Sequence, residues 1–220
     1  MIQAVVFDFD GLLIDTETPW YRVWAEVFEE RGQELPLELY GRILGTTDAA
    51  FDLLGYLEEC TGIPVDRQAT YQRMRDRHTE LMKREQLRPG VLDYLKQAQE
   101  LGLKIGLASS SQREWVERHL RANHIFEYFN VIRTSDDVQK VKPDPELYLS
   151  ALNALGVEPQ HAVAFEDSPN GSRAAKAAGM NLVIVPNTLS STMAFDAYDL
   201  RINSMAEMRL QDVLANLNQK

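Results

Sequence analysis

Two aspartates stand directly behind the first apolar run of this sequence. Asp8 and Asp10 follow Ile2–Phe7, and side chains two apart in an extended segment point to the same side. Two carboxylates placed so close repel each other unless a cation binds between them or one of them is protonated. Carboxylate oxygens suit Mg²⁺, a hard cation. The pair therefore indicates a site for a metal ion and for proton transfer.

Further reactive groups follow later runs of the same kind. They are Ser109, Ser110 and Ser111 after IGLA, Lys142 in an extended piece just before Pro143, and Glu166 and Asp167 after AVAF. Ligands of open parallel sheets bind beyond the carboxyl ends of the strands. An ionised carboxylate can attack phosphorus, and a lysine with hydroxyl groups can neutralise and orient a phosphate. This set of groups favours phosphoryl transfer.

The elements that must position these groups alternate between strand and helix. The apolar runs predict strands near 2–7, 103–109, 129–135, 161–168 and 181–186. Amphipathic segments, several closed by glycine, predict helices near 91–102, 113–124, 145–156, 170–179 and 205–217. A repeated strand-then-helix order requires right-handed crossovers and helices on both faces of the sheet. The predicted fold class is α/β, with a doubly wound, mostly parallel, Rossmann-like sheet.

Residues 16–85 differ from the rest of the chain because they contain helical patterns without strand-like runs. Thr18 is the expected N-cap of the first helix, with Pro19 at its first position. The stretch RDRH, in a later helical segment, is interpreted as a solvated face. We expect a catalytic core from 1–15 and 86–220, and an inserted all-helical cap domain at 16–85.

The overall composition limits the possible partners. The formal net charge is −10 and the pI is near 4.9, so a polyanion such as DNA would be repelled. One cysteine, Cys60, suits a reducing compartment. The sequence shows neither a secretory signal nor an apolar run near the ~20 residues that span a bilayer. We expect a cytoplasmic monomer that binds neither nucleic acid nor membranes.

Four segments together resemble the motifs of a known family. DFDGLLIDTE, GLASSS, KVKPDPE and FEDSPNG are similar, in order and spacing, to the four motifs of the haloacid dehalogenase superfamily. The branch resembled is the phosphatase and β-phosphoglucomutase-like one, with a helical cap. The resemblance implies that Asp8 is the nucleophile and Asp10 the general acid and base. It implies that Ser109 binds the transferring phosphate, with Ser110 the alternative, and that Lys142 stabilises the phosphoaspartate.

The resemblance also implies a cofactor and its ligands. Asp8, the backbone carbonyl of Asp10, and Asp167 would hold Mg²⁺, with Glu166 in or just outside the coordination shell. Two more residues are expected at the substrate: Gly11 within the first motif, and Glu17 at the hinge to the cap.

The expected activity is Mg²⁺-dependent hydrolysis of a small phosphorylated metabolite, a phosphomonoester of the sugar phosphate type, through an aspartyl-phosphate. The alternative is a phosphosugar mutase. Mutases carry a histidine where this chain has Trp20, and an arginine in the stretch that reads GTTDAAF from Gly45 here, so hydrolysis is favoured. A signalling receiver and a non-catalytic binding protein are weaker alternatives, because the order of the motifs differs from a receiver and all the reactive residue types are present.

Overall fold

The computed structural model describes residues 1–40 and 51–217, so the GTTDAAF stretch with Gly45 lies largely outside the described residues. The chain divides into two compact units. One consists of Met1–Asp15 and Gln86–Lys220, and the other of Thr16–Glu85.

The first unit contains a parallel sheet of six strands in the order β3-β2-β1-β4-β5-β6. The strands are β1 (Ala4–Phe7), β2 (Lys104–Ala108), β3 (Val131–Arg133), β4 (Ala162–Glu166), β5 (Asn181–Ile184) and β6 (Leu200–Arg201). The chain builds outward from β1 to β3, then returns to the other side of β1 with β4. The strand order therefore reverses between β1 and β4, which is where α/β sheets bind ligands.

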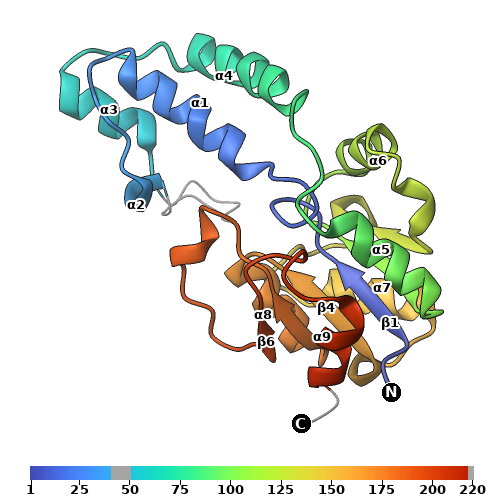
Figure 1. Ribbon diagram of the computed structural model, residues 1–220. Helices are drawn as coiled ribbons and strands as arrows, with labels where there is room; N and C mark the ends of the chain where they lie inside the picture. The colour runs from blue at the N-terminus through green and yellow to red at the C-terminus, as the bar shows by residue number, and fades with distance from the viewer. Residues whose placement is uncertain (41–50, 218–220) are drawn as a thin grey trace. The chain divides into compact units, whose positions relative to one another are not determined.

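Helices cover both faces of this sheet (Figure 1), which confirms the predicted doubly wound α/β fold. Alternate residues of β1 point to opposite faces of the sheet. Ala4 and Val6 pack with residues of α7 (Glu146–Leu155) and α8 (Pro169–Ala177), while the ring of Phe7 stacks on that of Phe165 with centroids 5.0 Å apart. Tyr94 of α5 meets Phe165 edge-on at 5.5 Å. The helices are α5 (Val91–Glu100), α6 (Arg113–Ala122), α7 (Glu146–Leu155), α8 (Pro169–Ala177) and α9 (Leu210–Leu217).

Two details of this unit differ from expectation. The helix predicted from residue 205 begins at Leu210, because residues 205–207 form a turn. The short edge strand β6 was not predicted, because two residues are too few to show an alternating pattern. In the described part of the chain, short 3₁₀ turns also connect the main elements: Phe126–Tyr128, Ser135–Asp137, Pro159–His161 and Ser190–Thr192.

The described residues of the second unit form helices without strands, as predicted. They are α1 (Glu17–Glu29), α2 (Leu37–Tyr40), α3 (Leu53–Thr61) and α4 (Arg67–Met82). Helix α1 begins at Glu17 with Thr16 at the N-cap, so the prediction of Thr18 as the cap is wrong by two residues. Across the described part of the whole chain, every helix is too short or too polar to cross a bilayer.

Helices α1 and α4 pack against each other, with an ion pair between Arg77 and Glu26 at 2.7 Å on their outer side. The prediction of a solvated RDRH face holds for the arginines but is wrong for His78. This residue is buried, and its ring stacks on Trp20 with centroids 4.0 Å apart. The aromatic partner explains the difference, because the imidazole ring can pack as an apolar surface.

Candidate active site

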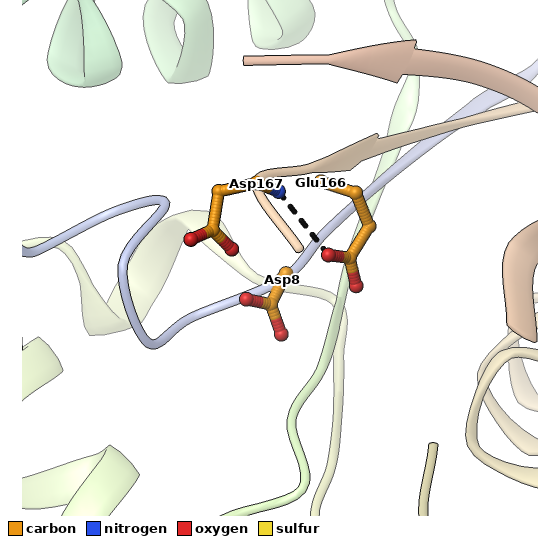
Figure 2. A group of neighbouring side chains, drawn as sticks. All are labelled: Asp8, Glu166 and Asp167. Carbon is orange, nitrogen blue, oxygen red and sulfur yellow. Dashed lines mark hydrogen bonds between the residues drawn. The ribbon is translucent and has the colours of Figure 1, made fainter. Parts of the chain in front are cut away.

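The register of β1 against β4 brings three carboxylates to one end of the sheet. Phe7 pairs with Phe165, and the amide of Asp8 donates to the carbonyl of Phe165 at 3.0 Å, so Asp8 stands beside Glu166. Figure 2 shows Asp8 at the end of β1 together with Glu166 and Asp167 at the end of β4. All three are buried, and one oxygen of each lies within 4.8 Å of the others. This cluster could bind a metal ion.

Lys142 lies inside this group of charges. Its ammonium donates to Asp8 Oδ1 at 2.5 Å and to Glu166 Oε1 at 2.7 Å, and its nitrogen lies 4.9 Å from the ring centroid of Tyr148. The residue is 9% exposed, which rules out a merely solvated lysine. Burial disfavours the ammonium, but the charges of Asp8 and Glu166 more than offset this and raise the pKa of Lys142. The backbone there is a turn, not the extended piece predicted before Pro143.

The negative charge of the cluster exceeds what one lysine offsets. Burial raises the pKa of Asp8, the charge of Glu166 adds to the rise, and the ammonium of Lys142 opposes it; the resulting pKa is about 7. An ordinary aspartate titrates near 4. Asp8 would therefore be partly protonated at neutral pH unless a further cation binds nearby.

Glu166 has both of its oxygens engaged by protein donors. Oε1 accepts from Lys142 and from the Tyr148 hydroxyl, the latter at 2.7 Å. Oε2 accepts from the Asp167 amide at 3.2 Å and from the amide and hydroxyl of Ser168 at 3.3 and 3.1 Å. A Cβ added at Gly171, in the first turn of α8, would overlap the Glu166 carboxylate. The glycine therefore lets the helix approach Glu166 closely.

Asp167 is held by a residue that the sequence reasoning missed. The amide nitrogen Nδ2 of Asn187 donates to Asp167 Oδ2 at 2.7 Å. Gly11 lies against both, at φ +80°, and a Cβ there would overlap Asp167 and press on Asn187. The backbone N–H of Gly11 donates to the carbonyl of Ile14 at 2.8 Å. The guanidinium of Arg88 donates to the Gly11 carbonyl at 2.6 Å and so supports the same turn.

The carboxylate of Asp10 bonds to residues that follow β2 and to a residue of α6. Its Oδ2 accepts from Ser109 at 3.2 Å and from Ser111 at 2.7 Å, and its Oδ1 accepts from the indole N–H of Trp115 at 3.0 Å. Ser109 is buried, whereas Ser110 is exposed. The roles of Ser111 and Trp115 were not foreseen. Ser111 lies before α6 and Trp115 lies in its first turn, so no regular spacing in the sequence marked the two as partners of Asp10.

Glu17, the remaining predicted residue, is the first residue of α1 and belongs to the unit Thr16–Glu85. Its predicted contact with substrate stays a prediction.

Comparison with known proteins identifies relatives over the whole length of the chain. The family model of haloacid dehalogenase-like hydrolases matches residues 5–185. YhcW of Bacillus subtilis, named only provisionally as a phosphatase, is 52% identical over 218 residues, which is 99% of each chain. Hexitol phosphatase B of Escherichia coli is 34% identical over 221 residues, or 97% of each chain. The crystal structure of CbbY from Rhodobacter sphaeroides in complex with phosphate has a TM-score of 0.73 and 32% identity, covering 99% of this chain and all of that one.

Proposed function

Because the chain belongs to the haloacid dehalogenase-like hydrolases and is a phosphoric monoester hydrolase, we propose that it uses Mg²⁺ and Asp8 to hydrolyse a small sugar phosphate. The observation that carries the proposal is the meeting of Asp8, Lys142, Glu166 and Asp167 at the reversal point of the sheet. A hexitol phosphatase among the relatives and a phosphate complex among the similar structures support a small phosphorylated substrate. The unit Thr16–Glu85 is then the cap domain and the other unit the catalytic core.

The donor set of the site fits a divalent cation. Three buried carboxylates face one ammonium, and the raised pKa of Asp8 reflects this excess of negative charge. Oxygen ligands suit Mg²⁺, which takes one or two protein carboxylates together with phosphate oxygens and water. We assign Asp8, Asp167 and the backbone carbonyl of Asp10 to the metal. When bound, Mg²⁺ would offset negative charge on the phosphoryl oxygens.

Glu166 then has a supporting role. Its two oxygens already accept five hydrogen bonds, from Lys142, Tyr148, Asp167 and twice from Ser168. A direct bond to the metal would compete with these donors. We therefore place Glu166 just outside the coordination shell, where it holds the ammonium of Lys142 next to Asp8.

The residues divide the reaction into two displacements. An oxygen of ionised Asp8 forms a bond to phosphorus as the bond to the leaving alcohol oxygen breaks, and Asp10 gives that oxygen its proton. Water then attacks the phosphorus, transfers a proton to Asp10, and releases phosphate and free Asp8. Lys142 stabilises the ionised nucleophile and the transferring phosphoryl oxygens, and Ser109 donates to the phosphate.

The mutase alternative has less support. Trp20, which stands where mutases carry a histidine, stacks on buried His78 within the helical unit. A packed indole offers no group for proton transfer to a sugar hydroxyl. The expectations of a monomer and of a cytoplasmic location stay predictions.

The proposal is tested by phosphate release and by trapping the intermediate. We expect the wild type to release phosphate from p-nitrophenyl phosphate with MgCl₂ and to lose this activity in EDTA. Asp8→Asn should abolish turnover and labelling by ³²P-phosphomonoester, whereas Asp93→Asn, an exposed aspartate of α5, should behave as wild type. A folded Asp8→Asn protein with more than about a tenth of wild-type turnover would overturn the nucleophile assignment.

A panel of sugar and polyol phosphates then defines the substrate class. Isomerised sugar phosphate formed in excess of free phosphate would favour the mutase alternative instead.

A further inference from the structure

The carboxyl group of Asp10 receives two different kinds of donor. Oδ2 lies 3.2 Å from the hydroxyl of Ser109 and 2.7 Å from that of Ser111, while Oδ1 lies 3.0 Å from the indole nitrogen of Trp115. The serines follow β2, and Trp115 is in the first turn of α6. The mechanism above uses Asp10 and Ser109 but gives no role to the indole.

The hydroxyl and indole donors differ in whether they can also accept a hydrogen bond. A hydroxyl group can donate or accept by rotating its hydrogen, whereas an indole N–H only donates. Oδ1 of Asp10 must therefore always accept from Trp115. The contacts favour Oδ2 as the oxygen that carries a proton, because the hydroxyl of Ser111 can rotate and accept from it.

Phosphate binding increases the importance of Trp115. The hydroxyl of Ser109 has one hydrogen, so it cannot donate to Asp10 and to a phosphate at the same time. Once Ser109 donates to the phosphate, Asp10 still accepts from the hydroxyl of Ser111 and the indole N–H of Trp115.

The indole itself is fixed by its surroundings. The ring of His119 lies 4.0 Å from that of Trp115, and His119 Nδ1 is 2.8 Å from the Trp115 carbonyl. The guanidinium of Arg118 lies 5.2 Å from the indole centroid. A ring held in this way keeps its N–H direction, which is what orienting a carboxyl group requires.

We propose that Trp115 is a positioning residue that fixes the orientation of Asp10 and places its transferable proton on Oδ2. During the first displacement that proton moves from Oδ2 to the leaving alcohol oxygen while the phosphorus–oxygen bond breaks and the bond to Asp8 forms. The inference rests on the acid role that the proposed function gives to Asp10. It adds the residue that decides which oxygen of Asp10 carries the proton.

The test compares two substitutions of Trp115 on two substrates. Phenyl phosphate has a strongly basic leaving group that needs a proton, whereas p-nitrophenyl phosphate has a weakly basic one. Trp115→Phe replaces the indole with a single ring that has no N–H. Trp115→His is also a single ring, but its Nε2 stands at the ring position of the indole nitrogen and can donate. Trp115→Leu is a second variant without a donor should Trp115→Phe not fold.

We expect kcat/KM of Trp115→Phe to fall about tenfold or more on phenyl phosphate, but less than about threefold on p-nitrophenyl phosphate. Trp115→His should recover most of the loss on phenyl phosphate. Asp10→Asn should show the same preference for the weakly basic leaving group, more strongly. Trp24→Phe, in α1 of the other unit, controls for loss of an indole.

Two results would overturn the proposal. Equal losses on both substrates, or a Trp115→His variant as impaired on phenyl phosphate as Trp115→Phe, would mean that the indole acts by packing alone. If Asp10→Asn itself affects both substrates equally, the acid role of Asp10 fails as well. The behaviour of Asp10→Asn therefore separates failure of this inference from failure of the proposed mechanism.

Discussion

Replacing Lys142 by methionine removes the ammonium that contacts both Asp8 and Glu166. The side chains of these three residues are 6%, 10% and 0% exposed, so the two carboxylates would stay buried without their shared cation. Breaking a buried ion pair by removing one partner costs about 3–5 kcal/mol. We expect Lys142→Met to lower the free energy of unfolding by about 3 kcal/mol at pH 6. This is the lower end of that range, because Asp8 can take up a proton at this pH and so lose its charge.

The cost should grow with pH. In the wild type the pKa of Asp8 is about 7 in the folded protein against 3.8 for an unperturbed aspartate, so folded Asp8 binds more protons than unfolded Asp8 between these values. Stability from this group is present at low pH and is lost as pH rises toward 7, where the loss levels off. Without Lys142 the pKa of Asp8 lies higher, so the variant continues to lose about 1.4 kcal/mol per pH unit above pH 7.

Urea unfolding of both proteins in EDTA, from pH 6 to pH 8.5, measures this difference. Lys140→Met is the matched control, because that lysine is 73% exposed and lies 3.8 Å from Asp144; its effect should stay below about 1 kcal/mol at every pH. A Lys142→Met cost that does not change between pH 6 and pH 8.5 would contradict the coupling of the ammonium to Asp8.

Three further substitutions test the surroundings of the carboxylates. Gly171→Ala should lower the free energy of unfolding by about 1–3 kcal/mol, because the new methyl group overlaps the Glu166 carboxylate. A variant that unfolds in urea at the wild-type midpoint would refute the close approach of α8 to Glu166. Tyr148→Phe should cost about 1.5–3 kcal/mol in the same assay, since its hydroxyl donates to buried Glu166, and an unchanged midpoint would count against that bond. Asn187→Leu should weaken Mg²⁺ binding about ten- to a hundredfold by calorimetry, because Asp167 loses the amide that orients it; an equal Kd would remove Asn187 from the site.

The fold was largely predictable because its strands are buried on both faces. Such strands appear in the sequence as short, continuous apolar runs. Two of these runs end at Phe7 and Phe165, and the reactive carboxylates follow them directly in the sequence. The errors fall where the local signal is weak or ambiguous. Thr18 and Pro19 fit a helix start, yet a proline is tolerated anywhere in the first turn, and the helix begins at Glu17.

The candidate site was predictable only in the part that lies on the motifs. The motif residues lie at strand ends or precede a proline, and the structure buries all five: Asp8, Ser109, Lys142, Glu166 and Asp167. Lys142 bonds to Asp8 and Glu166, and Ser109 bonds to Asp10. Their supporting residues carry no such mark: Tyr148 and Asn187 look like ordinary members of a helix and a loop. Their importance comes from contacts across 18 and 20 positions of the chain, and such contacts depend on packing.

These supporting residues explain how the chain keeps like charges together in a buried place. Each carboxylate accepts from at least one protein donor. Asp8 and Glu166 share the ammonium of Lys142, Glu166 also accepts from Tyr148 and Ser168, and Asp167 accepts from Asn187. Buried charges are tolerated when they are paired and hydrogen-bonded. For Asp8 the compensation is incomplete, because burial and the charge of Glu166 raise its pKa in spite of the ammonium of Lys142. Asp8 is also the group that the proposed mechanism requires as nucleophile, and binding of a cation next to it would supply the missing compensation.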